Sequence, residues 1–466
     1  AETGGINAMI VDSTALPEQA VRDILASAFQ SAGQRCSALR MLYVQKDVEQ
    51  KVLTMLTGAM RELKVGRPWE LATDVGPVID DDALEGILAY CAKMEAEGRL
   101  IAKLEAPAGG RFVPPHILRV SGIEEIEREV FGPVLHVATF EADEIDRVVA
   151  AINARGYGLT FGLHTRIDAR VQQILDGIHA GNVYVNRNQI GAVVGAQPFG
   201  GEGLSGTGPK AGGPFYLKRF RKRAAAIAEA SPPPLTPAHK GEGSLKMPAP
   251  SLSWDDTRAA TFRGNAETST TASSVRDGGT VAFPDPGGWP RRADRIAILR
   301  RHLRGRAAEA IAAAAALDPG PFDLPGPTGE ANSLMLVPRG RVLCLGPGAD
   351  TLLAQVVLAL AAGNAVVAVA PGARAMLQPL AGKDLPLAIH EGVLDPADLA
   401  QVDCDVVASS ADDETLRAYR GALAARTGPI VRLVCEPVCP EAFVHERAIC
   451  VDTTAAGGNA SLLAAS

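Results

Sequence analysis

The sequence lacks an excess of positive charge. Its 53 Asp and Glu residues outnumber 46 Lys and Arg, which gives a formal net charge of −7 at pH 7. A protein that binds the phosphates of a nucleic acid needs a basic surface, so this charge balance argues against a nucleic-acid partner. The 47% hydrophobic and 21% charged content is typical of globular proteins, and 466 residues predict two to four domains.

No cysteine pattern typical of a disulfide framework or a zinc site is present. The chain has seven cysteines, an odd number, scattered along its length. This pattern is typical of a reducing compartment, so we predict a cytoplasmic protein. Cys435 and Cys439 lack the second pair of ligands that a structural zinc ion needs, so no metal site is predicted.

A long uninterrupted hydrophobic run is also missing. The most apolar stretch, residues 351–370, is rich in alanine and is interrupted by Gly363 and Asn364. It predicts a buried helix followed by a strand and not a membrane span. The chain opens at Ala1 with neither an initiator methionine nor a signal peptide, which we interpret as a segment of a longer polypeptide.

Apolar segments of strand length alternate with amphipathic segments of helical period in the first half of the chain. This alternation predicts an α/β fold with a mainly parallel sheet. Residues 221–290 are then rich in Pro, Ser and Thr and predict a partly disordered linker. Order is expected to return at residue 291, with one long helix over residues 293–316 and a smaller α/β unit behind it.

Cys36 is a candidate nucleophile. Gly33 permits a tight turn that would expose its sulfur, and Arg35 would favour the thiolate electrostatically. Glu2, beside two glycines, is a candidate general base. A lone cysteine is more often a core residue and a lone glutamate a surface one, so these residues alone leave both interpretations open.

Four short motifs occur in the order and approximate spacing of the aldehyde dehydrogenase superfamily. They are Glu2-Thr3-Gly4-Gly5, Gly33-Gln34-Arg35-Cys36, Glu129-Val130-Phe131-Gly132-Pro133 and Pro198-Phe199-Gly200-Gly201. Longer stretches at residues 1–8, 29–37 and 206–214 resemble the L-glutamate γ-semialdehyde (1-pyrroline-5-carboxylate) dehydrogenase module of the bacterial bifunctional proline utilization A proteins. The resemblance covers residues 1–220 and a tail at 447–463.

The resemblance implies a fold and a division into domains. An aldehyde dehydrogenase catalytic domain would occupy residues 1–220, followed by the linker at 221–290. A degenerate, Rossmann-like α/β domain would occupy residues 291–446. Residues 447–466 would form a flap that returns to the catalytic domain and covers the active site.

The resemblance also implies the catalytic and cofactor residues. Cys36 would attack the aldehyde carbon of L-glutamate γ-semialdehyde, and its backbone amide would stabilise the oxyanion. Glu2 would activate the water that hydrolyses the resulting thioester. Glu129 would bind the nicotinamide ribose of NAD, with Phe131 nearby.

Four further residues would hold the substrate. Ser37 and the backbone amides of Gly191 and Ala192 would bind its α-carboxylate, and Phe199 would pack on its aliphatic part. Amides of a glycine-containing loop are physically suited to an anion.

Two parts of the expected enzyme would lie upstream of this chain. One is the NAD-binding half of the aldehyde dehydrogenase, and the other is a proline dehydrogenase, the only part that would need FAD. Gly346 and Gly348 follow a predicted strand, but the third glycine of a dinucleotide fingerprint is missing, so we interpret residues 291–446 as structural. The resemblance leaves open peripheral membrane association and homo-oligomer formation of the full-length protein.

Three other functions were weighed. The chain could act on another aldehyde, or the segment alone could be a non-catalytic structural or oligomerisation module, since without its cofactor domain it cannot transfer hydride. A cysteine peptidase is disfavoured because no histidine lies near Cys36 in the sequence.

Overall fold

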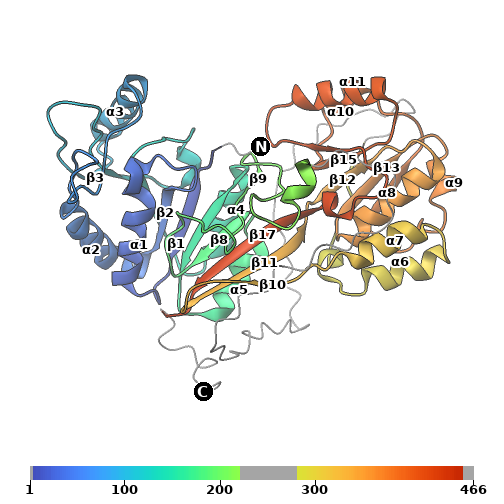
Figure 1. The fold of residues 1–466 in the computed structure, drawn as a ribbon, viewed down its shortest axis with the longest axis horizontal. Coiled ribbons are helices and arrows are strands. Elements are labelled where there is room, and N and C mark those ends of the chain that lie inside the picture. The colour runs from blue at the N-terminus through green and yellow to red at the C-terminus, as the bar shows by residue number, and fades with distance from the viewer. Residues whose placement is uncertain (1–3, 221–280, 455–466) are drawn as a thin grey trace, which may run out of the picture.

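The computed structural model describes residues 4–220 and 281–454, which form two α/β units side by side (Figure 1). The larger unit is built mainly from the first half of the chain, and the smaller one from the second half. Most of the predicted linker, and residues 455–466 of the predicted flap, lie outside the described residues. The prediction of an α/β fold is confirmed.

The larger unit is organised around a ten-stranded sheet. Its seven inner strands, β17 to β4, run parallel, and an antiparallel strand or strand pair closes each edge. In spatial order the strands are β10 (Phe322–Leu324), β11 (Glu330–Pro338), β17 (Val444–Asp452), β8 (Asn182–Val185), β7 (Thr160–His164), β1 (Asn7–Val11), β2 (Leu39–Gln45), β5 (Val134–Phe140), β4 (His116–Arg119) and β3 (Leu100–Lys103).

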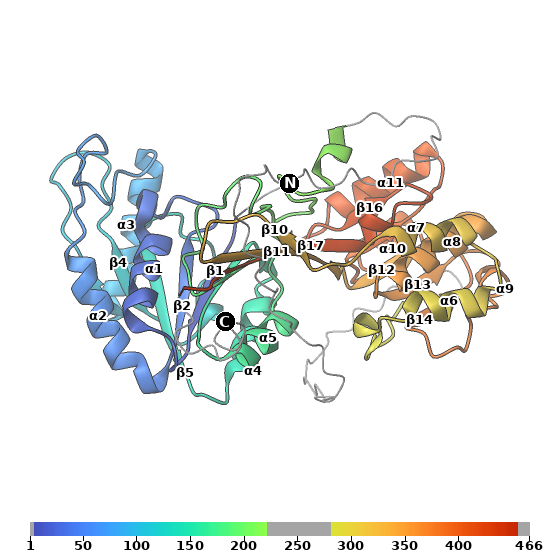
Figure 2. The same ribbon diagram turned by 60° about the horizontal axis from the view of Figure 1, so that its bottom comes forward.

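Helices cover both faces of this sheet. One face packs on α1 (Pro17–Phe29) and α2 (Glu49–Arg61). The other packs on α3 (Asp81–Ala96), α4 (Ile145–Ala154) and α5 (Asp168–Gly177). Figure 2 shows α1 and α2 on the opposite side of the strands from α4 and α5. A small two-stranded ladder pairs β6 (Tyr157–Gly158) with β9 (Glu202–Gly203).

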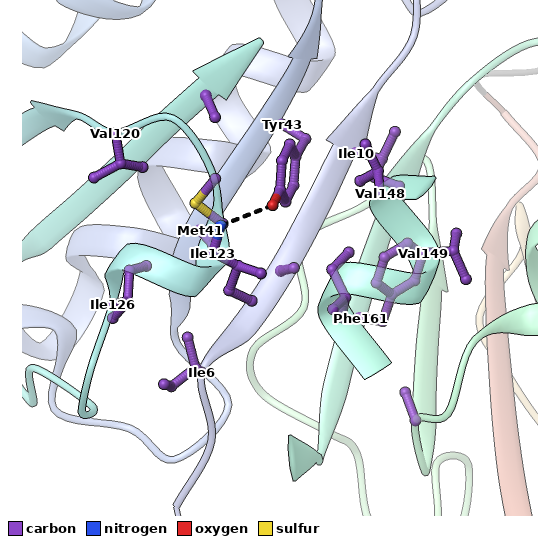
Figure 3. Close-up of a cluster of buried hydrophobic side chains, with 14 of the residues drawn as sticks. Ile6, Ile10, Met41, Tyr43, Val120, Ile123, Ile126, Val148, Val149 and Phe161 are labelled. Atoms are coloured by element: carbon purple, nitrogen blue, oxygen red, sulfur yellow. Dashed lines mark hydrogen bonds between the residues drawn. The ribbon is translucent and has the colours of Figure 1, made fainter. Parts of the chain in front are cut away.

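The inner strands are rich in apolar residues because they are buried on both faces, although β2, β4, β5, β7 and β17 also contain charged or histidine side chains. On β1, Ala8 and Ile10 join the cluster under α3 to α5, whereas Met9 and Val11 join the cluster under α1 and α2. Figure 3 shows the first cluster, in which the only polar tip drawn is the Tyr43 hydroxyl. That hydroxyl accepts a hydrogen bond from the Ile123 amide at 2.8 Å, and burial raises the pKa of Tyr43 to about 12.

The smaller unit contains a wholly parallel five-stranded sheet. If its strands are numbered 1 to 5 along the chain, their spatial order is 3-2-1-4-5, which matches the start of the Rossmann order. The strands, in spatial order, are β14 (Leu387–His390), β13 (Ala365–Val369), β12 (Arg341–Cys344), β15 (Val406–Ala408) and β16 (Arg432–Val434).

Helices cover both faces of the smaller sheet as well. One face packs on α6 (Arg295–Leu303), α7 (Ala308–Ala316), α8 (Ala349–Ala361) and α9 (Ala373–Met376). The other packs on α10 (Pro396–Leu399) and α11 (Asp413–Ala424). Short 3-10 turns occur at η1 (Gln30–Gly33), η2 (Lys46–Val48), η3 (Ile123–Glu125), η4 (Tyr216–Phe220), η5 (Trp289–Arg291) and η6 (Pro440–Phe443). Within the described ranges, no helix combines the length and the apolar character needed to cross a bilayer.

The prediction of one long helix over residues 293–316 is wrong. The segment forms two helices, α6 and α7, because Arg304, Gly305 and Ala307 adopt left-handed backbone conformations between them. A straight helix of that length would extend about 36 Å. Turning back instead lets both halves pack on α8, which spans only about 20 Å.

The predicted boundaries of the second domain also differ from the structure. Residues 322–338 were assigned to the smaller unit, but they form β10 and β11 of the larger sheet. The predicted flap begins inside β17, which already starts at Val444 and lies between β11 and β8. The smaller sheet is thus inserted between two neighbouring strands of the larger one. Asn364 ties the two crossing points together, since it accepts from the Gly340 amide at 2.8 Å and donates to the Phe443 carbonyl at 3.0 Å.

Candidate active site

Seven of the eight predicted site residues lie in the described part of the chain. They are Cys36, Ser37, Glu129, Phe131, Gly191, Ala192 and Phe199. Glu2 belongs to residues 1–3, outside the described residues, so its predicted role as a base stays a prediction. The described residues contain no group of three or more His, Cys, Asp or Glu side chains that could hold a metal ion.

Cys36 lies in the turn between α1 and β2, at the amino end of the strand. Ser31, Ala32 and Gly33 have φ values of 58°, 53° and 65°, three successive residues in the left-handed region. At Gly33 a Cβ atom would lie 2.2 Å from the carbonyl oxygen of Gly132, so only glycine fits there. The turn therefore rests directly on the Glu129–Pro133 motif, and Cys36 remains partly exposed at its end.

Asn7 fixes this turn from the neighbouring strand. Its amide nitrogen donates to the carbonyls of Cys36 at 2.7 Å and Ala38 at 2.9 Å, and its oxygen accepts from the Thr160 amide at 3.2 Å. Asn7 is buried, so these contacts are shielded from water. The sequence analysis gave this residue no role, because nothing local distinguishes an asparagine that bonds across strands.

Gln189 connects the same turn to the predicted substrate loop. Its side-chain nitrogen donates to the Ser37 carbonyl at 3.2 Å, and its backbone amide donates to the Ser27 hydroxyl at 3.1 Å. Ser37 itself is buried. Two residues further on, a Cβ on Gly191 would lie 3.8 Å from an Arg35 side-chain nitrogen. The structure thus brings the Gly191–Ala192 loop beside the cysteine turn.

Glu129 lies where three motifs meet. One carboxylate oxygen accepts from the backbone amide of Gly5 at 3.1 Å, and the other accepts from two nitrogens of Arg40 at 3.1 and 3.3 Å. A Cβ on Gly4 would lie 2.4 Å from the carboxylate, which explains the glycine there. The Glu2–Gly5 motif and Glu129 are therefore in direct contact, although they are far apart in the sequence.

A small open pocket lies beside this carboxylate. It has a volume of about 170 Å³ and is bounded by α3 on one side and by residues 128–131 on the other. Phe131 lines it and leaves 43% of its surface exposed, which is unusual for a phenylalanine. An exposed aromatic ring next to a carboxylate is suited to a flat, hydroxyl-bearing ligand such as a nucleoside.

Neutral His136 makes hydrogen bonds to Tyr90, which lines the pocket, and to Arg40. One ring nitrogen lies 2.9 Å from the Arg40 carbonyl and the other 2.8 Å from the Tyr90 hydroxyl. Burial lowers the pKa of His136 to about 4 and raises that of Tyr90 to about 12. Neither group titrates near neutral pH, so both act here as fixed hydrogen-bonding groups.

Phe199 lies on a loop held by strands from the far end of the chain. Its backbone exchanges two hydrogen bonds with Ala211, at 3.0 and 2.8 Å. The adjoining Lys210 amide donates to the Glu446 carboxylate on β17 at 2.6 Å. Gln197, just before the loop, donates to Glu330 on β11 at 2.8 Å. Figure 1 shows β11 and β17 running side by side past β8 and β9.

In the smaller unit, the side chain of Gln355 on α8 occupies the glycine turn at Gly346. The Gly346 amide donates to the Gln355 side chain at 3.0 Å, and the Gly346 carbonyl accepts from the Ser410 amide at 2.7 Å. Gln355 is 1% exposed and occupies the position in front of the turn. An amide that would face a phosphate is therefore already bonded, so this turn does not fit a dinucleotide.

Comparison with known proteins relates the first half of the chain to one family. Residues 1–224 match the model described as the aldehyde dehydrogenase family. The chain is also 42% identical over 478 residues to the bifunctional protein PutA of Salmonella typhimurium, across 99% of this chain and 33% of that protein. It is 40% identical over 220 residues to the 1-pyrroline-5-carboxylate dehydrogenase of Geobacillus kaustophilus, across 47% of this chain and 42% of that protein.

One solved structure is similar over nearly the whole chain. Proline utilization A of Corynebacterium freiburgense is 22% identical, matches 97% of this chain and 39% of its own, and gives a TM-score of 0.62. At that identity the likeness concerns the fold alone. The chain spans about a third of the length of the PutA relatives that it matches.

Proposed function

We propose that this chain is the catalytic half and C-terminal unit of an NAD-dependent dehydrogenase that oxidises L-glutamate γ-semialdehyde to L-glutamate, the second step of proline degradation. The complete polypeptide would carry its NAD-binding half and an FAD-dependent proline dehydrogenase upstream. The family match of residues 1–224 and the names of the relatives support this proposal.

The observation that carries the proposal is the convergence of three separate motifs. Glu129 accepts from Gly5, three residues after Glu2, and from Arg40, four residues after Cys36. Gly33 touches the backbone of Gly132 in the same place. The turn that carries the predicted nucleophile, the residues that follow the predicted base and an acidic residue beside an open pocket thus lie in contact, which supports one common site.

The residues present fit the nicotinamide end of NAD. Glu129 is an acceptor for ribose hydroxyls, and the exposed Phe131 borders the same pocket. The plugged turn at Gly346 does not supply a second dinucleotide site, which agrees with a structural role for the smaller unit. When bound, NAD would take up a hydride from the substrate carbon.

Cys36 would begin the reaction by forming a C–S bond to the aldehyde carbon. The aldehyde oxygen then carries negative charge, and the Cys36 backbone amide would donate to it. Asn7 holds the Cys36 and Ala38 carbonyls, and so keeps this part of the turn from rotating as charge develops. Loss of hydride from the same carbon leaves a thioester on Cys36.

Hydrolysis of the thioester would complete the turnover. Glu2 would take a proton from water, whose oxygen attacks the thioester carbon, and the C–S bond breaks to release the carboxylate and the thiol. The contact between Gly5 and Glu129 anchors the segment that carries Glu2.

The α-carboxylate end of the substrate would bind between Ser37 and the Gly191–Ala192 loop. Gln189 ties Ser37 to that loop, so the two parts of the carboxylate site would keep a fixed spacing. Phe199 would pack on the methylene groups, with its backbone fixed by Ala211. This arrangement favours an aldehyde with an amino-acid end over a simple aliphatic aldehyde.

We also propose that the full-length protein is cytoplasmic and homo-oligomeric, with a peripheral association with the membrane. All seven cysteines lie in the described part of the chain and none forms a disulfide, which is compatible with a reducing compartment. Residues 455–466 would act as the flap over the active site, since β17 delivers the chain to the larger sheet just before them.

The test uses the full-length protein with NAD and L-glutamate γ-semialdehyde. Cys36→Ala is expected to abolish NAD reduction, by at least about 10⁴-fold in kcat, because the covalent step is lost. Cys91→Ala is the matched control, because burial raises the pKa of the Cys91 thiol to about 12 and keeps it unreactive. Retention of activity by Cys36→Ala would overturn the proposal.

Two further arms examine the substrate and the flap. Butyraldehyde, which lacks the α-carboxylate, is expected to give a kcat/KM at least about 100-fold lower, because the carboxylate contacts are lost. For the flap, removal of residues 455–466 is cleaner than removal of 447–466, since the latter cuts into β17 between β8 and β11. Unchanged kinetics after the shorter deletion would contradict the flap.

A further inference from the structure

Arg40 on β2 is among the largest fully buried side chains of the described structure. Its side chain is 1% exposed, and its guanidinium group lies between the cysteine turn and the Glu129–Pro133 motif. Long charged side chains are almost never buried to this extent unless they are paired. The sequence analysis gave this residue no role.

On one side Arg40 holds the nucleophile turn. Nη2 donates to the carbonyl of Arg35 at 3.2 Å, in the peptide that leads into Cys36. Burial lowers the pKa of the Arg40 guanidinium, and the charges of Glu129 and Cys36 oppose that shift. By reciprocity the guanidinium favours the thiolate.

On the other side Arg40 holds the predicted cofactor residues. Nε and Nη2 both donate to one carboxylate oxygen of Glu129, and Nη1 donates to the Gly132 carbonyl at 3.1 Å. The guanidinium carbon lies 5.2 Å from the centre of the Phe131 ring. One planar group therefore orients both residues that border the pocket.

These contacts fix the Glu129 carboxylate and still allow it to accept a further hydrogen bond. Arg40 occupies one of its oxygens and the Gly5 amide the other, while a carboxylate has about four acceptor positions. Three hydrogen bonds leave about one acceptor position, and Glu129 lines the pocket in which a ribose would bind. Lysine could not replace this arrangement, because a single ammonium cannot reach the Arg35 and Gly132 carbonyls and Glu129 together.

We propose that Arg40 is a positioning residue that couples the cofactor site to the nucleophile, by orienting Glu129 and Phe131 while holding the Cys36 turn and favouring its thiolate. This inference rests on the proposed dehydrogenase activity. It predicts that one substitution, remote from the substrate, changes both NAD affinity and thiol reactivity.

The test compares Arg40→Met and Arg40→Lys in the full-length protein. The control is Arg119→Met on the same sheet, which removes an arginine paired with Glu49 and 40% exposed. Two properties are measured: KM for NAD in steady-state kinetics, and the pH dependence of iodoacetamide alkylation of the Cys36 peptide, followed by mass spectrometry. The alkylation needs neither NAD nor substrate.

Both Arg40 variants are expected to raise KM for NAD by roughly 10-fold or more, because the fork that orients Glu129 is lost. Arg40→Met is also expected to move the alkylation midpoint upward by about one pH unit, whereas Arg40→Lys, which keeps the charge, moves it much less. A purely structural role would lower the active fraction without changing either property. Arg119→Met should match the wild type in both.

An unchanged KM for NAD in both variants, or an unchanged alkylation midpoint in Arg40→Met, overturns the proposal. If Arg40→Met does not fold, the KM of Arg40→Lys for NAD still tests the proposal. If the wild type does not reduce NAD with the semialdehyde, the dehydrogenase proposal fails, and the alkylation profiles still decide whether Arg40 acts on Cys36.

Discussion

The two parallel sheets of this chain differ in what they bury. The larger sheet encloses charged side chains, among them Arg40, Lys210, Glu446 and Arg447. In the described part of the smaller unit, the buried polar side chains are neutral and few: Gln355, Asn364 and Ser409. Both sheets are covered by helices on both faces, so burial itself does not explain the contrast.

The difference indicates where the chain has accepted an energetic cost. Burying a charged side chain costs several kcal/mol of folding free energy. A well-placed partner of opposite charge offsets about that amount. In the larger sheet these charges hold loops that carry Cys36, Glu129 and Phe199. In the described part of the smaller unit no charged side chain is buried in this way, so we expect its aliphatic interior to serve stability alone.

The largest effect on this difference between the two sheets is expected for Glu446→Ala in the full-length protein. The change leaves the Lys210 amide without its acceptor, and the buried charge of Lys210 and the charge of Arg339 without this carboxylate, so unfolding free energy should fall by about 3–5 kcal/mol. Because Lys210 adjoins the strand pair that fixes Phe199, KM for the semialdehyde should rise while KM for NAD stays constant. Urea denaturation and steady-state kinetics measure the two effects. Glu446→Gln, which keeps one acceptor oxygen, is the control and should lose less of both.

A cavity in the smaller unit should affect stability and leave kinetics alone. Leu358 on α8 is 1% exposed, and Leu358→Ala should lower the unfolding free energy by about 3 kcal/mol. The same denaturation and kinetic assays apply. A changed KM for either substrate at a temperature where the variant is folded would show that the smaller unit acts on the active site, and the comparison would fail.

The larger sheet should also be the one that loses stability at acidic pH. Burial lowers the pKa of His136 to about 4 and that of His164 to about 3, below the usual value of 6.5. The unfolded chain then binds more protons, so stability should fall as pH drops from about 6.5 to 4, by on the order of 2 kcal/mol for each histidine. Denaturation at several pH values measures the slope, and His136→Gln should flatten it. An equal slope in the variant would exclude His136 as a source.

The smallest effect is expected at the plugged glycine turn. Gln355→Leu removes the side chain that bonds the Gly346 amide and carbonyl, and should cost about 1 kcal/mol of stability. Kinetics should not change. If the variant lowered KM for NAD, the smaller unit would have regained a dinucleotide role, and its structural interpretation would be wrong.

The sequence could predict what is local or periodic. It predicted the α/β class, and the glycine at position 33 indicated a tight turn before Cys36. It could not reveal that Arg40, Glu129 and Gly5 meet, because no local pattern marks a contact between segments more than eighty residues apart. The break between α6 and α7 had one local sign, Gly305, but the arginine and alanine around it favour helix, so packing on α8 was needed to select the turn.

Strand β17 shows the same limit most clearly. Its first half contains the charged run His445, Glu446 and Arg447, whereas the flap predicted from the family resemblance began only at residue 447. The structure buries these residues because Glu202 and Lys210, from a loop some 240 residues earlier, lie beside them. Partners this distant in sequence decide whether a charged run is a strand.

The insertion point of the smaller unit has a consequence for how this protein could have arisen. Pro338 at the end of β11 pairs with Val444 at the start of β17, so the two crossing points lie only about 5 Å apart. A two-residue turn could join them and leave a simple hairpin in the larger sheet. The smaller sheet with α8 to α11 could therefore be gained or lost in a single genetic event, without rethreading any strand around the reactive thiol, whereas α6 and α7 precede β10 and would need a second event.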